Sequence, residues 1–237
     1  MGHRALQLLF FSFALICTSV KALGQANEVS FSIGAVSTSD QNATSRVLGF
    51  ACPVSNPDCG LFSTRLRSDT ALGFEGTYAR RLARAGVASF YAELPLVGIP
   101  GHDVNAQVSP PPGVTIAGNT TFSSSSILFT PSARVKFFDS SAVSPFASVG
   151  GGLAHSSTDT QDAGGLFSFA SNTGALQFGG GIDFGKRSSR LGFRAEVRDF
   201  YFGSGAQASS PALGVQTSLD PERLHHLFAG GGMVVRF

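Results

Sequence analysis

The final stretch of the chain, LFAGGGMVVRF from Leu227 to Phe237, constrains the fold more than any other part of the sequence. Every second residue counted back from Phe237 is apolar or small, which is the period of a β-strand with one apolar face. A strand at this position has to pair with earlier strands, and a sheet that closes on itself leaves no open edge. The stretch therefore predicts a closed β-barrel.

Seven earlier segments show the same alternation, and the links between the segments are in turn long and short. Tight turns at one end and extended loops at the other are typical of membrane barrels. We therefore predict an all-β fold, an eight-stranded antiparallel up-and-down transmembrane β-barrel with four long outer loops. In the fifth segment Phe146 competes with Val149 and Leu153 for the apolar face, so its facing stays open. The seven segments are Glu28–Ser37, Thr70–Arg80, Val87–Val97, Ser126–Phe138, Pro145–His155, Gly174–Phe184 and Arg190–Phe202.

The amino terminus has the pattern of a secretory signal peptide. A short basic region with Arg4 precedes an apolar run that is too short to span a membrane. We predict a signal peptide over residues 1–22, with cleavage after Ala22 or as late as Ala26, and a barrel domain over residues 27–237. A lipoprotein signal at Cys17 is the alternative, but the bulky Ile16 stands where such signals carry a small residue.

Composition excludes several functional classes and agrees with export. The chain has 17 basic and 15 acidic residues, and the predicted signal would remove Arg4 and Lys21 and leave the two signs equal. No basic footprint for nucleic acid is present, and no apolar run of about 18 residues follows the signal. Cys52 and Cys59 then remain as a pair within ACPVSNPDCG, and an oxidising compartment favours a disulfide between them.

The face opposite the apolar one carries small residues and charges of both signs. Small side chains fit the crowded interior of an eight-stranded barrel. A basic residue facing lipid at the midplane costs about 2–4 kcal/mol, so the charges should point inward and neutralise one another. We predict a salt-bridged, largely plugged lumen. Its polar network is expected to comprise Glu75, Glu93, Arg134, Asp183, Arg194, Glu196 and Arg198.

The segments RAEVRDFY (Arg194–Tyr201) and GGGMVVRF at the carboxy terminus resemble the small bacterial outer-membrane barrels of the outer membrane protein A and X type. The resemblance implies the bacterial outer membrane as location, with its lipids and lipopolysaccharide as surroundings. It also implies that Met233, Val235 and Phe237 form a signal for the barrel-insertion machinery. Such barrels carry Trp and Tyr girdles, whereas this chain has no Trp and three Tyr. We expect Phe90, Phe137, Phe184, Phe193, Phe200, Phe202 and Phe237 to take that role.

The sequence predicts function only coarsely. We expect a monomer with a structural role in the membrane, or one that contacts a surface partner through its outer loops. The alternative is a narrow, porin-like pore for small or apolar solutes. A soluble secreted ligand-binding barrel and a lipid-modifying enzyme are further alternatives. We predict no enzymatic activity, no cofactor and no metal site, because the histidines fall in loops or at strand ends. His225 and His226 are expected at the rim, in water.

Overall fold

The computed structural model describes residues 26–47, 61–109, 118–160, 168–203, 207–210, 215–218 and 223–237. Every regular element in these ranges is a β-strand, and all strands belong to one sheet whose neighbouring strands are antiparallel. No helix in the described ranges is long and apolar enough to cross a membrane. The predicted signal peptide and both Cys52 and Cys59 lie outside the described residues.

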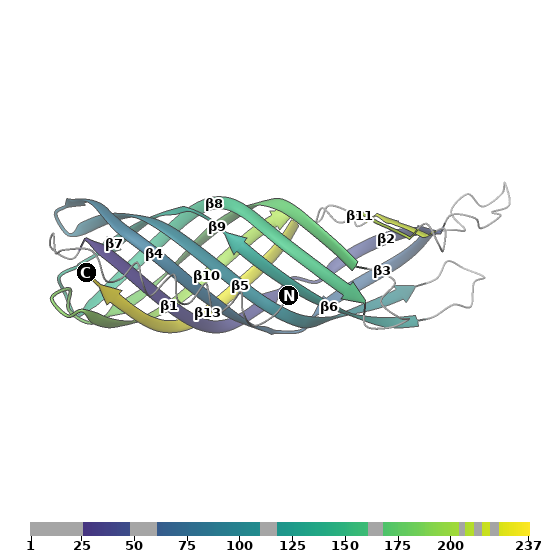
Figure 1. Ribbon diagram of the computed structural model, residues 1–237, viewed down its shortest axis with the longest axis horizontal. Coiled ribbons are helices and arrows are strands. Elements are labelled where there is room, and N and C mark those ends of the chain that lie inside the picture. Colours follow the sequence, from purple (N-terminus) through teal and green to yellow (C-terminus); the bar gives the residue numbers. More distant parts are fainter. Residues whose placement is uncertain are drawn as a thin grey trace, which may run out of the picture.

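The sheet closes into a barrel because the first strand pairs with the last (Figure 1). Val29 lies opposite Val235 and Ala35 opposite Ala229, and on its other side β1 pairs with β4. Counting β6 and β7 as two halves of one wall position gives a ring of eight, so the predicted fold class is confirmed. In ring order the strands are β1 (Asn27–Thr38), β4 (Ala71–Ala85), β5 (Ala88–Ser109), β6 (Gly118–Phe129) with β7 (Ser132–Phe137), β8 (Val143–Thr160), β9 (Ser168–Phe184), β10 (Leu191–Gly203) and β13 (Arg223–Arg236).

The fourth wall position is interrupted at Thr130–Pro131, where the sequence predicted an unbroken strand. Proline has no backbone N–H to donate to the ladder. Thr130 N still donates to Pro95 O (3.4 Å), and Gly151 N donates to Pro131 O (3.1 Å), so both neighbouring strands bridge the break. The break therefore stays hydrogen-bonded to β5 on one side and to β8 on the other.

The strands continue beyond the barrel on the side of the long connections (Figure 1). The sequence predicted a polar loop from Thr38 to about Asp69, but that segment contains β2 (Gln41–Val47) and β3 (Leu61–Ser68). Near them lie β11 (Gln207–Ser210) and β12 (Val215–Ser218), and β12 pairs with β2. Much of the predicted loop length is thus an extension of the sheet, which we call the outer extension: β2, β3, β11, β12 and the adjoining ends of β5, β6, β8 and β9.

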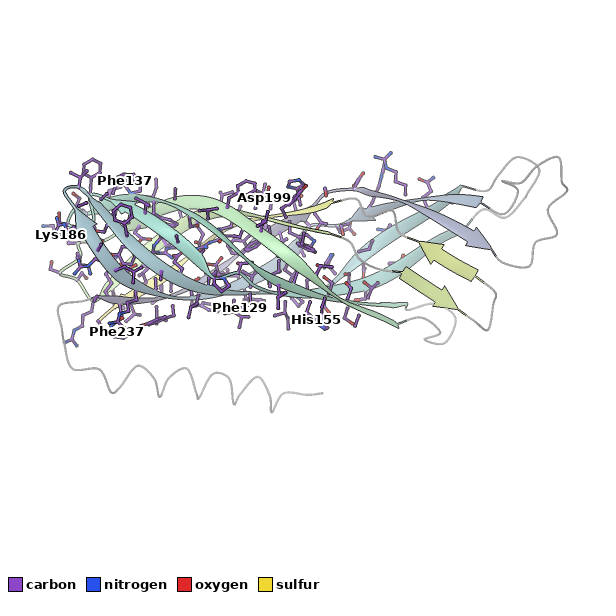
Figure 2. The ribbon with its side chains drawn as sticks, turned by 90° about the horizontal axis from the view of Figure 1, so that it is seen from above. Phe129, Phe137, His155, Lys186, Asp199 and Phe237 are labelled. Carbon is purple, nitrogen blue, oxygen red and sulfur yellow. The ribbon has the colours of Figure 1, made fainter. Side chains whose placement is uncertain are left out.

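The opposite end carries three tight turns, and we call it the turn end. The turns lie between β4 and β5, between β7 and β8, and between β9 and β10. Gly86 and Gly185 have positive φ angles of 57° and 114°, and the non-glycine residue Phe138 has 53°. A left-handed conformation suits glycine, which has no Cβ to clash. Phe137, Lys186 and Phe237 all lie at this end (Figure 2).

Large apolar side chains form a belt around the outside of the barrel. Phe31 and Ile33 on β1 face outward, whereas Ser30 and Ser32 face inward, as the alternation predicts. The undecided fifth strand has Phe146 inside and Val149 and Leu153 outside. The outward set on the barrel strands includes Leu72, Phe74, Phe90, Leu94, Leu96, Ile127, Phe129, Phe137, Leu176, Phe178, Ile182, Phe184, Leu191, Phe193, Val197, Leu227, Met233 and Val235.

Candidate functional site

The barrel interior is the candidate site, and it has two levels. Toward the turn end it contains ionised side chains, and toward the outer extension it contains apolar ones. Alternation puts both kinds on the inner face of the same strands. On β10, for example, Arg194, Glu196 and Arg198 are followed two residues later by Phe200 and then Phe202.

The charged level is close to neutral. Of the described residues, six buried carboxylates and five buried cations line it, and Arg187 reaches it from a turn. Every one of these carboxylates has at least one cation within ion-pair distance, so mutual neutralisation offsets part of the cost of removing the charges from water. The carboxylates are Glu28, Glu75, Glu93, Asp139, Asp183 and Glu196, and the cations are Arg134, Lys136, Arg194, Arg198 and Arg236.

Glu28 and Asp183 organise the part of this level nearest the turn end. Glu28 accepts from Arg134 at 2.5 Å and from Lys136 at 2.8 Å. Asp183 is held by both sides of the Arg194 guanidinium, with Nε to Oδ1 at 2.7 Å and Nη2 to Oδ2 at 3.1 Å. Lys136 Nζ lies 2.6 Å from Asp183 Oδ2 and thus joins the two carboxylates. A bidentate pair of this kind fixes geometry as well as charge.

Arg198 organises the part nearer the centre of the barrel. Its guanidinium lies 3.0 Å from Glu196, 3.1 Å from Glu75 and 3.5 Å from Glu93. Glu93 also meets Arg134 at 3.0 Å, which connects this cluster to the one around Glu28. The ions consequently form one continuous network that links strands on opposite sides of the barrel.

Aromatic rings fill the space between the ions. Phe146 lies against Arg194 with 4.6 Å from the guanidinium carbon to the ring centroid, and against Arg134 with 5.4 Å. Cation–π contacts of this kind are stronger where water is excluded. The ring fits because residue 181 is glycine: a Cβ there would lie 2.8 Å from Phe146 Cζ and 2.2 Å from the Ala195 carbonyl oxygen.

Asp139 closes the interior at the turn end. It belongs to the turn between β7 and β8, and its side chain is buried. Tyr91 Oη donates to Asp139 Oδ2 at 2.9 Å, and Arg187 from the next turn donates to both groups. Arg81 and Lys136 lie 3.8 and 3.7 Å from the carboxylate. The two turns are thereby joined across the end of the lumen.

The level nearer the outer extension is an apolar plug. Phe200 and Phe228 are fully buried, and Phe202 is 3% exposed. The sequence placed Phe200 and Phe202 among the interface aromatics, and that prediction is wrong because both lie inside the barrel. Their spacing from Arg194 and Arg198 was the available signal, since residues two apart share a face. The plug comprises Val36, Ala71, Val97, Ile99, Leu128, Ala154, Ala175, Phe200, Phe202 and Phe228.

Two histidines also lie in the interior near the plug. His226 is buried, where the sequence predicted a rim position in water, and its ring centroid lies 4.8 Å from that of Phe202. His102 is buried too and lies 3.4 Å from the hydroxyl of Ser68. His225 faces outward and pairs with Asp199 at 2.9 Å. In the described ranges no group of three or more His, Cys, Asp and Glu side chains could hold a metal ion.

All seven residues expected in the polar network lie inside the barrel and take part in ion pairs. The sequence-based set omitted Glu28, Lys136, Asp139 and Arg236. Lys136 shares the face of Arg134, and Glu28 shares the face of Ser30 and Ser32, so alternation could have found both. Asp139 lies in a turn, where alternation carries no information. Of the expected insertion signal, Met233 and Val235 face outward.

Comparisons with known proteins support the fold. No protein-family model matches the sequence, and no curated protein matches it. The solved structures it is similar to include the outer membrane protein OprG from Pseudomonas aeruginosa, with a TM-score of 0.52 and 14% identity over 87% of this chain and 94% of that one. They also include the outer membrane protease OmpT from Escherichia coli, with a TM-score of 0.53 and 7% identity over 93% and 99%. The fold is that of a bacterial outer-membrane β-barrel.

The similarity to OmpT corrects one expectation. The sequence predicted no enzymatic activity, because its histidines fall in loops or at strand ends. A barrel of similar fold is a protease, so the fold does not exclude catalysis and the prediction is withdrawn. At 7% identity the similarity concerns the fold alone, because function depends on side chains placed on a fold.

Proposed function

We propose that this protein resides in the bacterial outer membrane as a closed barrel, and that it acts through the outer extension it holds above the membrane. The observation that carries this proposal is an apolar exterior around an interior filled by ion pairs and packed aromatic rings. A soluble barrel has the reverse arrangement, with its apolar face inside.

The exterior supports the membrane location. On β10 the outward residues Leu191, Phe193, Ala195 and Val197 include no charge, although the inward residues between them are mainly charged. A lysine or arginine at the lipid midplane costs about 2–4 kcal/mol, and this strand avoids that cost by facing Arg194 and Arg198 inward. The next outward residue after Val197 is Asp199, which pairs with His225. The same separation holds on β1, where Glu28 is inward and Val29 to Ala35 have no outward charge.

The interior supports a closed lumen. A solute entering from the outer side meets Phe200, Phe202 and Phe228, and behind them the network around Arg198 and Glu28. Opening a path would separate paired buried ions, and a broken buried pair costs about 3–5 kcal/mol. We therefore favour the closed barrel over a narrow pore for small or apolar solutes.

The outer extension supports a role at the cell surface. β5 continues from Leu96, its last large outward apolar residue, to Ser109, which is about 40 Å further along the strand at about 3.3 Å per residue. The extension is rich in uncharged polar residues, as in GNTTFSSSS at the start of β6 and QNATSRV in β2. Strands of this composition are suited to water and to contact with lipopolysaccharide or another surface.

The location is tested by cysteine labelling on intact cells. Two variants each introduce one cysteine: Gln107→Cys at an exposed position of the outer extension, and Ser141→Cys in an exposed turn at the other end. A membrane-impermeant maleimide should label the first on whole cells and the second only after the outer membrane is opened, with the parent chain as background control. Equal labelling of both positions on intact cells would contradict the proposal.

The closed lumen is tested by conductance of the refolded protein in planar bilayers. We expect no steps above bare lipid. A variant with Phe200→Ala and Phe228→Ala removes two rings of the plug but leaves every ion pair, and it should also stay silent. Stable unitary steps from the parent chain would favour the narrow pore.

A further inference from the structure

Exposed charges of the described residues are distributed unevenly along the barrel axis. The exposed carboxylates of Asp40, Asp69 and Asp103 are at the outer extension, where Asp40 pairs with Arg65 at 2.9 Å. Arg67 lies 3.8 Å from the same carboxylate. At the turn end the exposed charged side chains are all cations, namely Arg80, Arg84, Lys186 and Arg190.

The carboxylate side chains in the charged level near the turn end are already engaged in ion pairs with other cations. Asp139 is buried among Tyr91, Arg187, Arg81 and Lys136. Glu28 and Asp183 are also buried in ion pairs. Within the described ranges, Arg80, Arg84, Lys186 and Arg190 form no ion pair with another side chain. The turn end thus presents four cationic side chains that pair with no carboxylate side chain of the described residues.

The same turns carry exposed apolar side chains beside the cations. Val87 lies in the turn between β4 and β5, Leu82 and Arg84 lie on the end of β4 that leads into this turn, and Leu191 follows Arg190 directly. Leu82, Val87 and Leu191 are all more than half exposed. This juxtaposition suits the boundary of a bilayer, where acyl chains cover the apolar groups and long cationic side chains reach the head groups.

We propose that the turn end binds anionic phospholipids of the leaflet it faces, with Arg80, Arg84, Lys186 and Arg190 contacting their phosphate groups. The inference rests on the proposed membrane location and adds a lipid class and a defined end of the barrel. A cation near a membrane surface favours an anionic over a zwitterionic lipid by about 1 kcal/mol, which is about a fivefold preference. At the outer extension, where Asp40 offsets Arg65 and Arg67, no such preference is expected.

The chain has no tryptophan, so a single introduced indole reports on the lipids around one position. Leu191→Trp places it beside Lys186 and Arg190. Leu176→Trp is the matched control toward the other edge of the belt, because the two leucines are 58% and 59% exposed. Both proteins are refolded into phosphatidylcholine vesicles containing brominated phosphatidylglycerol or brominated phosphatidylcholine, and quenching gives the relative association constant of the two lipids. We expect the association constant of phosphatidylglycerol relative to phosphatidylcholine to be about five at residue 191 and about one at residue 176.

A second set of variants tests the cations themselves. In the Leu191→Trp background, the double variant Lys186→Gln, Arg190→Gln should lower the preference for phosphatidylglycerol to a ratio near one. Two controls should leave that ratio unchanged: Arg190→Lys, which keeps the charge, and Arg65→Gln, which lies in the outer extension. If the Gln variant does not insert, raising salt on the parent reporter should lower the same ratio, because ions screen exposed charges. Equal ratios at residues 191 and 176, or a ratio that salt and the Gln variant leave unaltered, would overturn the lipid proposal. Failure of the parent chain to show a heat-modifiable band in any vesicle would instead contradict the membrane location.

Discussion

Arg198 gives the sharpest test of the charged interior. The side chain is fully buried and is the one cation that pairs with Glu75 among the described residues. Arg198→Met keeps much of the side-chain volume but removes the charge. It leaves both Glu75 and Glu196 without a paired cation among the described residues, although Glu196 keeps the hydrogen bond from the Ser32 hydroxyl at 2.6 Å. We expect a loss in unfolding free energy of about 3–5 kcal/mol, the cost of leaving a buried charge uncompensated.

The measurement is a urea or guanidinium titration of the barrel in detergent micelles, followed by cold gel mobility and far-ultraviolet circular dichroism. Adding Glu75→Gln to Arg198→Met should recover part of the loss, because it removes one of the two orphaned carboxylates while Glu93 keeps Arg134 as its partner. The loss should also shrink at acidic pH, because protonation neutralises the orphaned carboxylates.

Arg65→Met is the matched control, since the Arg65–Asp40 pair is about half exposed and such pairs contribute about 0–1 kcal/mol. A loss below about 1 kcal/mol for Arg198→Met would refute the view that the ions depend on one another. A double variant no more stable than the single one would refute the assignment of Glu75 as the orphaned partner.

Three further perturbations address other parts of the interior. Phe228→Ala should cost about 3–5 kcal/mol in the same titration, because it leaves a cavity in the apolar plug; a cost near zero would show that the plug is loosely packed. Gly181→Ala should lower the unfolding free energy by about 1–3 kcal/mol through steric overlap. Gly76→Ala is the control and should be neutral, because a Cβ at residue 76 meets no atom within 4 Å. Equal effects of the two substitutions would contradict the steric argument. Asp139→Asn should weaken the closure with Arg187 and raise hydrogen exchange in the turn amides, with unchanged exchange as the contrary result.

The sequence was sufficient for the strands and their facing because alternation is a local property. Arg194, Glu196 and Arg198 lie two residues apart, so each must be on the same side of β10, and the cost of ions in lipid decides that this side is the interior. Phe200 and Phe202 follow Arg198 at the same two-residue spacing, so they also lie on the inward face of β10. Composition favoured reading them as interface aromatics, but their position on the inward face of the strand decides otherwise.

Only the closed barrel determines which ions meet. Arg134 and Glu28 are 106 residues apart, and Ser32 and Glu196 are 164 apart, so no local pattern could pair them. Their pairing follows from ring order and from the stagger between strands, which bring inward side chains of β7, three positions from β1, and of β10, two positions from β1, to the same height as those of β1. Closure also makes neighbours of inward residues that lie at the same height along the barrel axis. The ions therefore gather in one level, and the apolar side chains gather in the plug.

The sequence by itself therefore determined the strand positions, the all-β class and the inward direction of the charges, because these depend on period two and on the solvent each face meets. The tertiary structure decided the extension of the sheet beyond the barrel, the closure of the turn end by Asp139 and the unpaired cationic side chains beside it. These features depend on which groups distant in sequence come within hydrogen-bond or ion-pair distance. That proximity exists only once the last strand has paired with the first.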